Sequence, residues 1–305
     1  MADAPEVEEL ATGLAFPKGP VVLADGSFLV VEIRRATLTR VPAGGGTPEV
    51  VAELGGGPNG AAIGPDGAAY VVNNGGFLWS KLGDMEIPFE LSTMSNQPPD
   101  FTGGWVDRVD LATGEHSVLY RECDGLTFLG PNDIVFDADG GFWFTDFGKT
   151  RPREADRGSL YYATADGSHI VQAARGLYGP NGVGLSPAGD RVYVAESFSG
   201  RLLAWDVTGP GQVASPMATV VEATKGHFDS LAVEADGAVV VAAIGQGLCV
   251  VQADGSGHEY VPIPDRFTTN VAFGGEDRRT AFVTLSGSGR LVAVDWPRPG
   301  LGLAY

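Results

Sequence analysis

The sequence predicts an all-β protein in which residues 1–305 form a single domain, a six-bladed β-propeller. One hairpin pattern recurs six times: a short entrance motif, an apolar strand, a turn that usually contains glycine, and a second apolar or aromatic strand. Most copies are 41 to 49 residues apart, the length of one four-stranded blade. No 3.6-residue apolar period persists, and the 45 glycines suit a protein with many tight turns.

The third copy shows the pattern most clearly, with an apolar run at 134–136, a turn at Asp139-Gly140 and an aromatic run at 142–144. The entrance residues of the six copies are, in chain order, Lys18, Asn59, Asn132, Asn181, Asp229 and Asn270. Further strand-like segments between the hairpins are expected to complete the blades, at 37–41, 105–109, 159–162 and 201–205. We expect the first ten or so residues to pair with the last strand, near 290–294, and so close the ring.

One spacing is anomalous, because 73 residues separate Asn59 from Asn132. The surplus falls within residues 78–104, a stretch rich in proline, methionine and phenylalanine. Loops of this length inside compact domains are usually functional or disordered. We expect a lid or rim loop over the channel mouth, with a dimer contact or an irregular excursion as alternatives.

The overall charge restricts the class of partner. The net charge is −18, which argues against nucleic acid or an anionic membrane as partner. No apolar run approaches the length of a membrane span, and the N-terminal residues MADAPEVEEL lack the apolar core of a signal peptide. Cys123 and Cys249 match no metal or redox motif, and Cys249 is expected to be a buried thiol. We therefore expect a cytoplasmic protein, a monomer or small homo-oligomer, whose partner is a small molecule.

The six entrance residues are expected to converge. In a propeller the first strand of each blade lines the central channel, so if the hairpin turns lie at one end, the entrance residues form a polar ring at the other. The second strands should bring Glu32, Asn73, Asp146 and Glu196 close to the same rim. Asparagine also suits turns, which would account for any single position but not for the six-fold coincidence. Asn59, Asn132, Asn270 and the neighbouring His227 are thus candidate substrate-binding residues.

Several copies resemble one known family. These are GPNDIVFDADGGFWFTD, GPNGVGLSPAGDRVYVAES and FDSLAVEADG, with GPVVLADGSFLVVEI in support. They resemble the senescence-marker-protein/gluconolactonase (regucalcin-like) family of six-bladed propeller lactonases, and the resemblance covers nearly the whole chain. It implies a lactonase-type hydrolase that acts on a lactone or related cyclic carbonyl compound in the channel mouth. It also implies one divalent cation (Ca, Zn, Mg or Mn), with Asn181 and Asp229 as ligands if a cation is bound, and with Asn132 near metal-bound water or substrate.

Lys18 departs from the family pattern. The family's glutamate ligand should open a Glu-Gly-Pro motif, which here reads Lys18-Gly19-Pro20. An ammonium has no lone pair for a metal, and at 4 Å and an effective dielectric near 20 it would repel a divalent ion by about 8 kcal/mol. We therefore expect no metal cofactor. The alternative is that Lys18 turns away and Glu32 or a water completes a cation site.

Without a metal, Lys18 and Asp229 are the candidate catalytic residues. The ammonium could polarise a carbonyl or hold an oxyanion, with Asp229 as its ion-pair partner or as general base. If Lys18 loses its proton, it could instead be a base or a Schiff-base nucleophile. The alternatives left open are a metal-independent lyase, isomerase or cyclase that uses Lys18, a non-catalytic small-molecule-binding propeller, and a Lys18–Asp229 pair that closes an inactive site.

Overall fold

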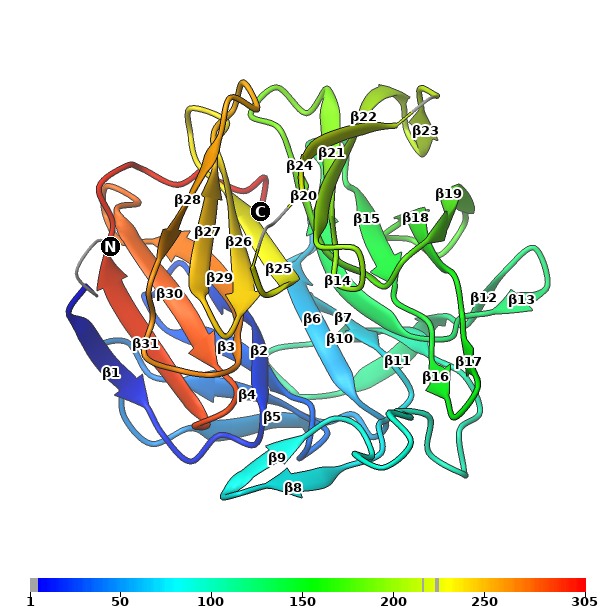
Figure 1. Cartoon of the computed structure of the whole chain (residues 1–305), viewed down its shortest axis with the longest axis horizontal. Helices are drawn as coiled ribbons and strands as arrows, with labels where there is room; N and C mark the ends of the chain where they lie inside the picture. The colour runs from blue at the N-terminus through cyan, green and yellow to red at the C-terminus, as the bar shows by residue number, and fades with distance from the viewer. Residues whose placement is uncertain (1–4, 216, 223–224) are drawn as a thin grey trace.

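Six antiparallel sheets are arranged around a central axis in the computed structural model, which describes residues 5–215, 217–222 and 225–305 (Figure 1). Each sheet has four strands in the blade path, so the predicted six-bladed β-propeller is confirmed. Among the described residues, no helix is long and apolar enough to cross a membrane.

The blades follow one another along the chain. Blade 1 contains β2 (Pro17–Val22), β3 (Phe28–Glu32), β4 (Thr37–Val41) and β5 (Glu49–Glu53). Blade 2 contains β6 (Pro58–Ile63), β7 (Ala69–Asn73), β10 (Trp105–Val109) and β11 (His116–Tyr120). Blade 3 contains β14 (Pro131–Phe136), β15 (Gly141–Asp146), β18 (Gly158–Thr164) and β19 (Ile170–Leu177).

The second half of the ring repeats this order. Blade 4 contains β20 (Pro180–Leu185), β21 (Arg191–Glu196), β22 (Arg201–Gly209) and β24 (Ala218–Glu222), with β23 (Gln212–Val213) also paired to β22. Blade 5 contains β25 (His227–Val233), β26 (Val239–Ile244), β27 (Gly247–Val251) and β28 (His258–Val261). Blade 6 contains β29 (Thr268–Gly274), β30 (Thr280–Leu285), β31 (Arg290–Asp295) and β1 (Val7–Ala11).

The two ends of the chain close the ring, as expected from the sequence. Strand β1 pairs antiparallel with β31, with Val7 opposite Val294 and Ala11 opposite Leu291. The N-terminal strand is therefore the outermost strand of the last blade. Because this pairing joins residues nearly 290 positions apart, it prevents the ring from opening between blades 6 and 1.

The hydrophobic core is divided into six layers, one between each pair of adjacent blades. The aromatic run of β15 illustrates the division, because successive strand side chains point to opposite faces. Phe142 and Phe144 pack toward blade 2, whereas Trp143 packs toward blade 4. Tyr70 of blade 2 meets Phe136 with ring centroids 5.0 Å apart. Burial on both faces explains why the inner strands read as continuous apolar runs.

The two faces of the ring differ. The turns between first and second strands lie on one face, here called the turn face, and the entrance residues lie on the other, the entrance face. Three small hairpins lie in connections at the entrance face: β8 (Ser80–Leu82) with β9 (Met85–Ile87), β12 (Glu122–Cys123) with β13 (Leu126–Thr127), and β16 (Thr150–Arg151) with β17 (Glu154–Ala155). The sequence patterns did not indicate these hairpins, since each strand has only two or three residues.

The long insertion, residues 74–104, joins the second and third strands of blade 2 at the entrance face. Trp79 packs edge-on against Phe16 with centroids 5.3 Å apart, beside the entry to blade 1. At its other end, the Thr150 backbone N–H donates to Asn96 Oδ1 at 2.8 Å, beside blade 3. The insertion therefore runs along the entrance face between these blades, and a role as a lid stays a prediction.

Candidate active site at the entrance face

A shift of register occurs at or beside the entrance residue in all six first strands. In blade 1 it falls between Lys18 and Val21, and in blade 5 between Phe228 and Leu231. Such β-bulges bend a strand and change the direction of a side chain, and they are common next to active sites. Six equivalent irregularities at one level of the channel place the entrance residues in comparable positions.

Small residues let the first strands approach closely at this level. A Cβ added to Gly60 would lie 2.7 Å from the carbonyl oxygen of Asn132 in the next blade. A Cβ added to Gly182 would lie 2.7 Å from the backbone nitrogen of Leu231. Both contacts are far too short for real atoms, so glycine is required. The glycine of each Asn-Gly pair thus allows the first strands to pack closely and does not form a turn.

Lys18 occupies the centre of the polar ring. Its ammonium nitrogen Nζ donates to Asn132 Oδ1 at 2.9 Å and to Asn181 Oδ1 at 2.8 Å, and it pairs with Asp229 Oδ1 at 2.7 Å. The Lys18 side chain is only 4% exposed. Three oxygens match the three protons of an ammonium. The structure thus brings together four of the predicted site residues, from blades 1, 3, 4 and 5.

Two serines hold the partners of Lys18 in position. Asn181 Nδ2 donates to Ser197 Oγ at 3.1 Å, and Ser197 Oγ donates to the Phe228 carbonyl at 2.6 Å. The Ser230 backbone N–H donates to Asp229 Oδ1 at 3.0 Å. These bonds leave Asn181 Oδ1 directed at Lys18. Neither serine was predicted from the sequence, although Ser230 directly follows an entrance residue.

Two buried carboxyl groups lie near the Lys18 ammonium. Burial raises the pKa of Asp229, and the charge of Lys18 opposes that rise. Burial raises the pKa of Asp133 to about 6, again with Lys18 acting in the opposite direction. Asp133 directly follows Asn132, and no role for it was predicted from the sequence. The sequence feature that could have revealed it is the Asn-Asp pair at this entrance, where two other blades have Asn-Gly.

The remaining predicted substrate-binding residues are less closely engaged. Asn59 is buried, and its Oδ1 has no hydrogen-bond partner within the described part of the chain. Asn270 is also buried, and its Oδ1 accepts from the Val271 backbone N–H at 2.7 Å. His227 is exposed at the rim, with Nδ1 3.1 Å from the Ser197 carbonyl oxygen. The Lys18 ammonium bonds to Asn132, Asn181 and Asp229 and to none of these three side chains.

The polar residues at the ends of the second strands were expected to line the rim of the polar ring, but they bind backbone instead. Each accepts a hydrogen bond from a backbone N–H of the segment that leads into the first strand of its blade: Glu32, Asn73, Asp146 and Glu196. Asp146, for example, accepts from Leu129 and Gly130 at 2.7 and 2.6 Å. Glu32 also accepts from Thr39 and Arg35. Glu32 is therefore occupied in holding its own loop, and it does not replace Lys18 in the ring.

A second buried lysine connects the insertion to blade 3. Lys149 is 1% exposed, and its Nζ donates to the Gly76 carbonyl at 2.7 Å. The same nitrogen lies 4.3 Å from the ring centre of Phe77 and 4.9 Å from that of Phe101. Burial lowers the pKa of Lys149 to about 7. Lys149 therefore anchors both ends of the insertion at the entrance face through hydrogen-bonding and cation–π contacts.

Solved structures with similar folds support the blade arrangement. A gluconolactonase from Xanthomonas campestris matches with a TM-score of 0.75 and 20% identity, over 97% of this chain and 96% of that chain. The calcium-binding protein regucalcin from Agrobacterium tumefaciens matches with a TM-score of 0.75 and 19% identity, over 98% and 95% of the two chains. At these identities the likeness concerns the fold.

Sequence relatives point to the same group of proteins. A gluconolactonase from Zymomonas mobilis is 27% identical over 212 residues, which is 63% of this chain and 51% of the relative. Lactonase drp35 from Staphylococcus haemolyticus is 32% identical over 147 residues, 46% of this chain and 44% of the relative. The chain thus spans about half the length of the curated relatives it matches.

The family profile described as the SMP-30/Gluconolactonase/LRE-like region matches residues 16–287, a span that includes all six entrance residues. This agrees with the resemblance seen in the hairpin motifs. The chain therefore belongs to the SMP-30/gluconolactonase/LRE-like family.

Proposed function

We propose that the protein is a small-molecule hydrolase of the lactonase type, which opens a lactone or related cyclic carbonyl compound at the entrance end of the channel. We propose further that Lys18 and Asp229 perform this chemistry without a resident divalent cation. The observation that carries the proposal is the position of Lys18 Nζ, within 2.9 Å of oxygens from three other blades. The curated lactonase relatives support the reaction class.

The side chains do not fit a divalent cation. A cation in contact with both Asn181 and Asp229 would compete for the oxygens that lie 2.8 and 2.7 Å from Lys18 Nζ. At 4 Å and an effective dielectric near 20, the ammonium would repel it by about 8 kcal/mol. The charges of Lys18 and Asp229 already cancel, so the ring supplies no excess negative charge for a metal. Lys18 therefore takes the electrostatic place of the cation.

The ammonium can stabilise a developing oxyanion. Because all three of its protons are engaged, a substrate carbonyl oxygen must first displace one acceptor, and a neutral amide of Asn132 or Asn181 is a weaker partner than the Asp229 carboxylate. When water adds to the carbonyl carbon, that oxygen becomes negative and its bond to the ammonium strengthens. The displaced amide gains nothing in this step. The exchange therefore favours the transition state over the bound substrate.

Asp229 is suited to be the general base. Its side chain is 14% exposed, compared with 4% for Lys18, so it is the more accessible member of the pair. Burial raises its pKa, which makes the carboxylate a stronger base than one in water. It takes a proton from the water molecule whose oxygen bonds to the carbonyl carbon. The ring C–O bond then breaks, and the proton passes from Asp229 to the departing alkoxide, which leaves a hydroxy acid.

A second candidate is a non-catalytic small-molecule-binding propeller. The saturation of Lys18 favours it, because a buried ammonium with three good acceptors is already stable in the absence of substrate. A metal-independent lyase, isomerase or cyclase would use the same two residues on a different substrate. These candidates differ in whether a lactone is consumed and whether acid is released.

The test is a pH-stat assay of sugar and aliphatic lactones, combined with elemental analysis of the untreated protein. We expect acid release that chelators do not reduce, no stoichiometric divalent metal, and a loss of kcat of at least ~100-fold in Asp229→Asn, as for removal of a general base. Asp206→Asn, at an exposed ion pair of the outer part of blade 4, is the matched control. One bound equivalent of metal with chelator-sensitive activity would refute the mechanism. Ligand binding by calorimetry without turnover would favour the binding propeller.

The other properties follow from charge and cysteines. The net charge of −18 supports a small-molecule partner rather than nucleic acid or a membrane. Both Cys123 and Cys249 are free and buried, which supports a reducing compartment, and we propose the cytoplasm. We propose a monomer or small homo-oligomer, which size-exclusion chromatography with light scattering will check. Cell fractionation that places the protein outside the cytoplasm would contradict the location.

A further inference from the structure

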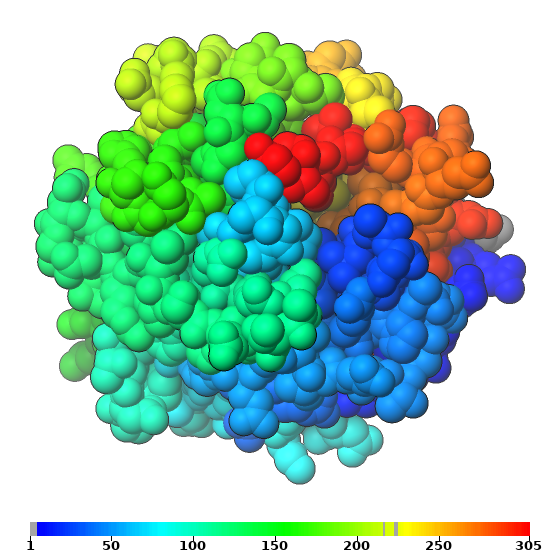
Figure 2. All heavy atoms as spheres, turned by 180° about the vertical axis from the view of Figure 1, so that it is seen from behind, coloured from blue at the N-terminus to red at the C-terminus, as the bar shows by residue number. Residues whose placement is uncertain are grey.

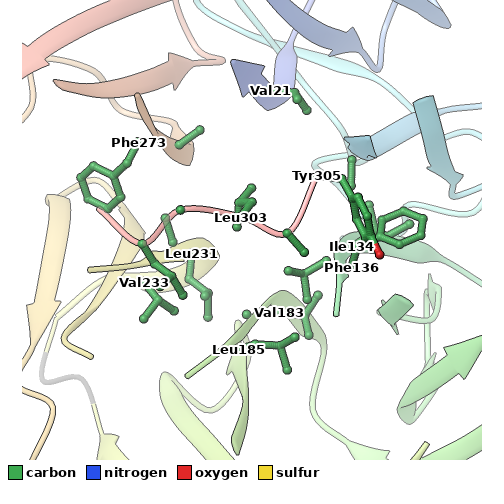
Figure 3. A pocket seen from close by; sticks show the side chains of 18 of the residues that line it. Val21, Ile134, Phe136, Val183, Leu185, Leu231, Val233, Phe273, Leu303 and Tyr305 are labelled. Atoms are coloured by element: carbon green, nitrogen blue, oxygen red, sulfur yellow. The ribbon is translucent and has the colours of Figure 1, made fainter. Parts of the chain in front are cut away.

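A cavity of about 430 Å³ lies in the channel toward the turn face, away from the Lys18 ammonium. Every blade contributes an apolar side chain of its first strand to the wall: Val21, Ala62, Ile134, Val183, Leu231 and Val271. The close-up in Figure 3 shows most of these side chains around the space. The same first strands thus carry polar residues at the entrance end and apolar residues beyond the bulges.

The C-terminal residues 301–305 form part of the wall. The segment starts at blade 5, where the Leu301 backbone N–H donates to the Val233 carbonyl at 2.8 Å. It reaches blade 3, where the Tyr305 ring packs edge-on against Phe136 at 5.9 Å. Figure 2 shows these residues in red beside a hollow near the middle of the turn face, and Figure 3 shows the segment crossing the pocket. The segment therefore partly closes this mouth of the channel.

The two ends of the C-terminal segment are held with different strength. Before it, Trp296 Nε1 donates to the buried carboxylate of Glu234 at 2.6 Å, and Arg298 pairs with the same carboxylate. At the far end, Tyr305 is 43% exposed, and its hydroxyl is 3.5 Å from the Ala138 carbonyl, the outer limit of a hydrogen bond. The segment can therefore move at Tyr305 while its base stays fixed, which provides a way into the cavity.

The chemistry of the wall restricts the ligand. Water needs two to four polar partners, which the apolar side chains of the six first strands do not provide. A cavity of roughly 150 Å³ lined by such side chains binds benzene. A space nearly three times larger suits a molecule with two or three rings. The polar groups at its inner end, Asp133 and Asn270, can accept or exchange a single hydrogen bond. Arg278 also lines the cavity, but it lies at the outer end, on the exposed turn between β29 and β30. An anion at the inner end, beside Asp133, would be buried without a partner at a high cost in free energy.

We propose that this cavity is a second binding site, for an uncharged, largely apolar molecule of two or three rings that carries one N–H or O–H donor. The donor faces Asp133, the rings lie against the six first strands, and Tyr305 closes over the outer end. Asp133 at the inner end also lies near the Lys18 ammonium, but binding in the cavity requires no lactone hydrolysis and is measured independently of it.

The test uses N-phenyl-1-naphthylamine, an uncharged fluorescent probe of this size with one N–H donor. We expect a saturable rise in fluorescence with one site per chain. The matched anionic probe, 8-anilinonaphthalene-1-sulfonate, has the same ring skeleton and should bind at least tenfold more weakly. Equal binding of both probes, or no saturable binding of the uncharged probe to the folded protein, would overturn the proposal.

Cavity-filling variants locate the site. Ala272→Phe places a large side chain into the cavity from β29, at a half-buried position, and should weaken binding of the uncharged probe at least tenfold. Ala232→Phe on β25 is the second such variant, should the first fail to fold. Val50→Phe, on the outer strand of blade 1 where Val50 is 51% exposed, is the matched control and should leave binding unchanged. Unchanged affinity in the folded cavity-filling variant would refute the location.

The C-terminal segment is tested separately by kinetics. Tyr305→Ala removes the ring contact with Phe136 and should raise the dissociation rate of the bound probe at least fivefold in stopped-flow displacement. The same variant should leave the melting temperature nearly unchanged, because the Tyr305 side chain is exposed at the surface. A dissociation rate equal to that of the wild type would show that Tyr305 does not close the site.

Discussion

Replacing Lys18 with methionine tests the contribution of the buried Lys18–Asp229 ion pair to stability. The change keeps the length of the side chain but removes its charge and all three donors. It leaves Asp229 without its cation and the two amide oxygens of Asn132 and Asn181 without a donor. Removing one partner of a buried ion pair costs about 3–5 kcal/mol, because the other charge stays buried without compensation.

That free energy corresponds to a measurable change in melting temperature. Unfolding entropy is about 2.1 cal/mol/K per residue, which for 305 residues gives roughly 0.6 kcal/mol/K. Lys18→Met should therefore lower Tm by about 5–8 °C at neutral pH, measured by scanning calorimetry. The six-bladed fold should persist, because each blade interface has its own apolar layer.

Two control variants separate this effect from a general loss of charge. Arg191→Met breaks an exposed pair with Asp206, 3.2 Å apart, and should lower Tm by less than about 2 °C, as expected for surface ion pairs. The double variant Lys18→Met/Asp229→Asn removes both buried charges and should be more stable than Lys18→Met alone. A Tm change in Lys18→Met as small as that in Arg191→Met would refute the buried pair.

Three further changes test other features of the entrance face. Lys18→Glu moves the nominal charge of the ring from 0 to −2 and should create a calcium site. Calorimetry should then show one equivalent of calcium bound by the variant and none by the wild type. No heat of binding would show that the oxygens of the ring cannot rearrange around a cation. Burial lowers the pKa of Lys149 to about 7, although the charges of Asp146 and Asp156 act in the opposite direction. Between pH 7 and 10 the unfolded chain therefore binds more protons than the folded one, so wild-type stability should rise with pH relative to Lys149→Met. A stability difference that is constant over this pH range would refute the lowered pKa. Asp146→Ala leaves three backbone N–H groups without their acceptor. It should lower the free energy of unfolding, measured by urea denaturation, by at least about 2 kcal/mol. A change near zero would mean that water replaces the carboxylate as acceptor.

Local sequence patterns determined the architecture. The repeated hairpin, with turns such as Asp139-Gly140, predicts six blades because turn chemistry and short apolar runs act over a few positions. The strand segments at 37–41 and 105–109 were found in the same way, and both are strands in the structure. The pairing of β1 with β31 was expected because the two ends of the chain must meet to close the ring, and the structure confirms it. The family also followed from these motifs, because they lie within the matched residues 16–287.

The phase of the repeats also indicated which residues converge. Lys18, Asn132, Asn181 and Asp229 were predicted to lie at one mouth, and the structure joins them through a single ammonium. The sequence left open whether Lys18 turns away from the ring, because the direction of a side chain depends on the bulges and on strands from other blades. It also assigned Glu32 and Asp146 to the rim without showing that they bind the backbone of the preceding loop.

Only the tertiary structure decided the features that depend on distant segments. Lys149 meets Phe77 and Phe101 because the insertion folds back across the entrance face, and no local pattern encodes that contact. The apolar cavity exists because six first strands, spread over more than 250 residues, form one wall and residues 301–305 cross its mouth. Hairpins result from interactions between near neighbours in the chain, whereas the chemistry of a ring depends on how all six blades close around one axis.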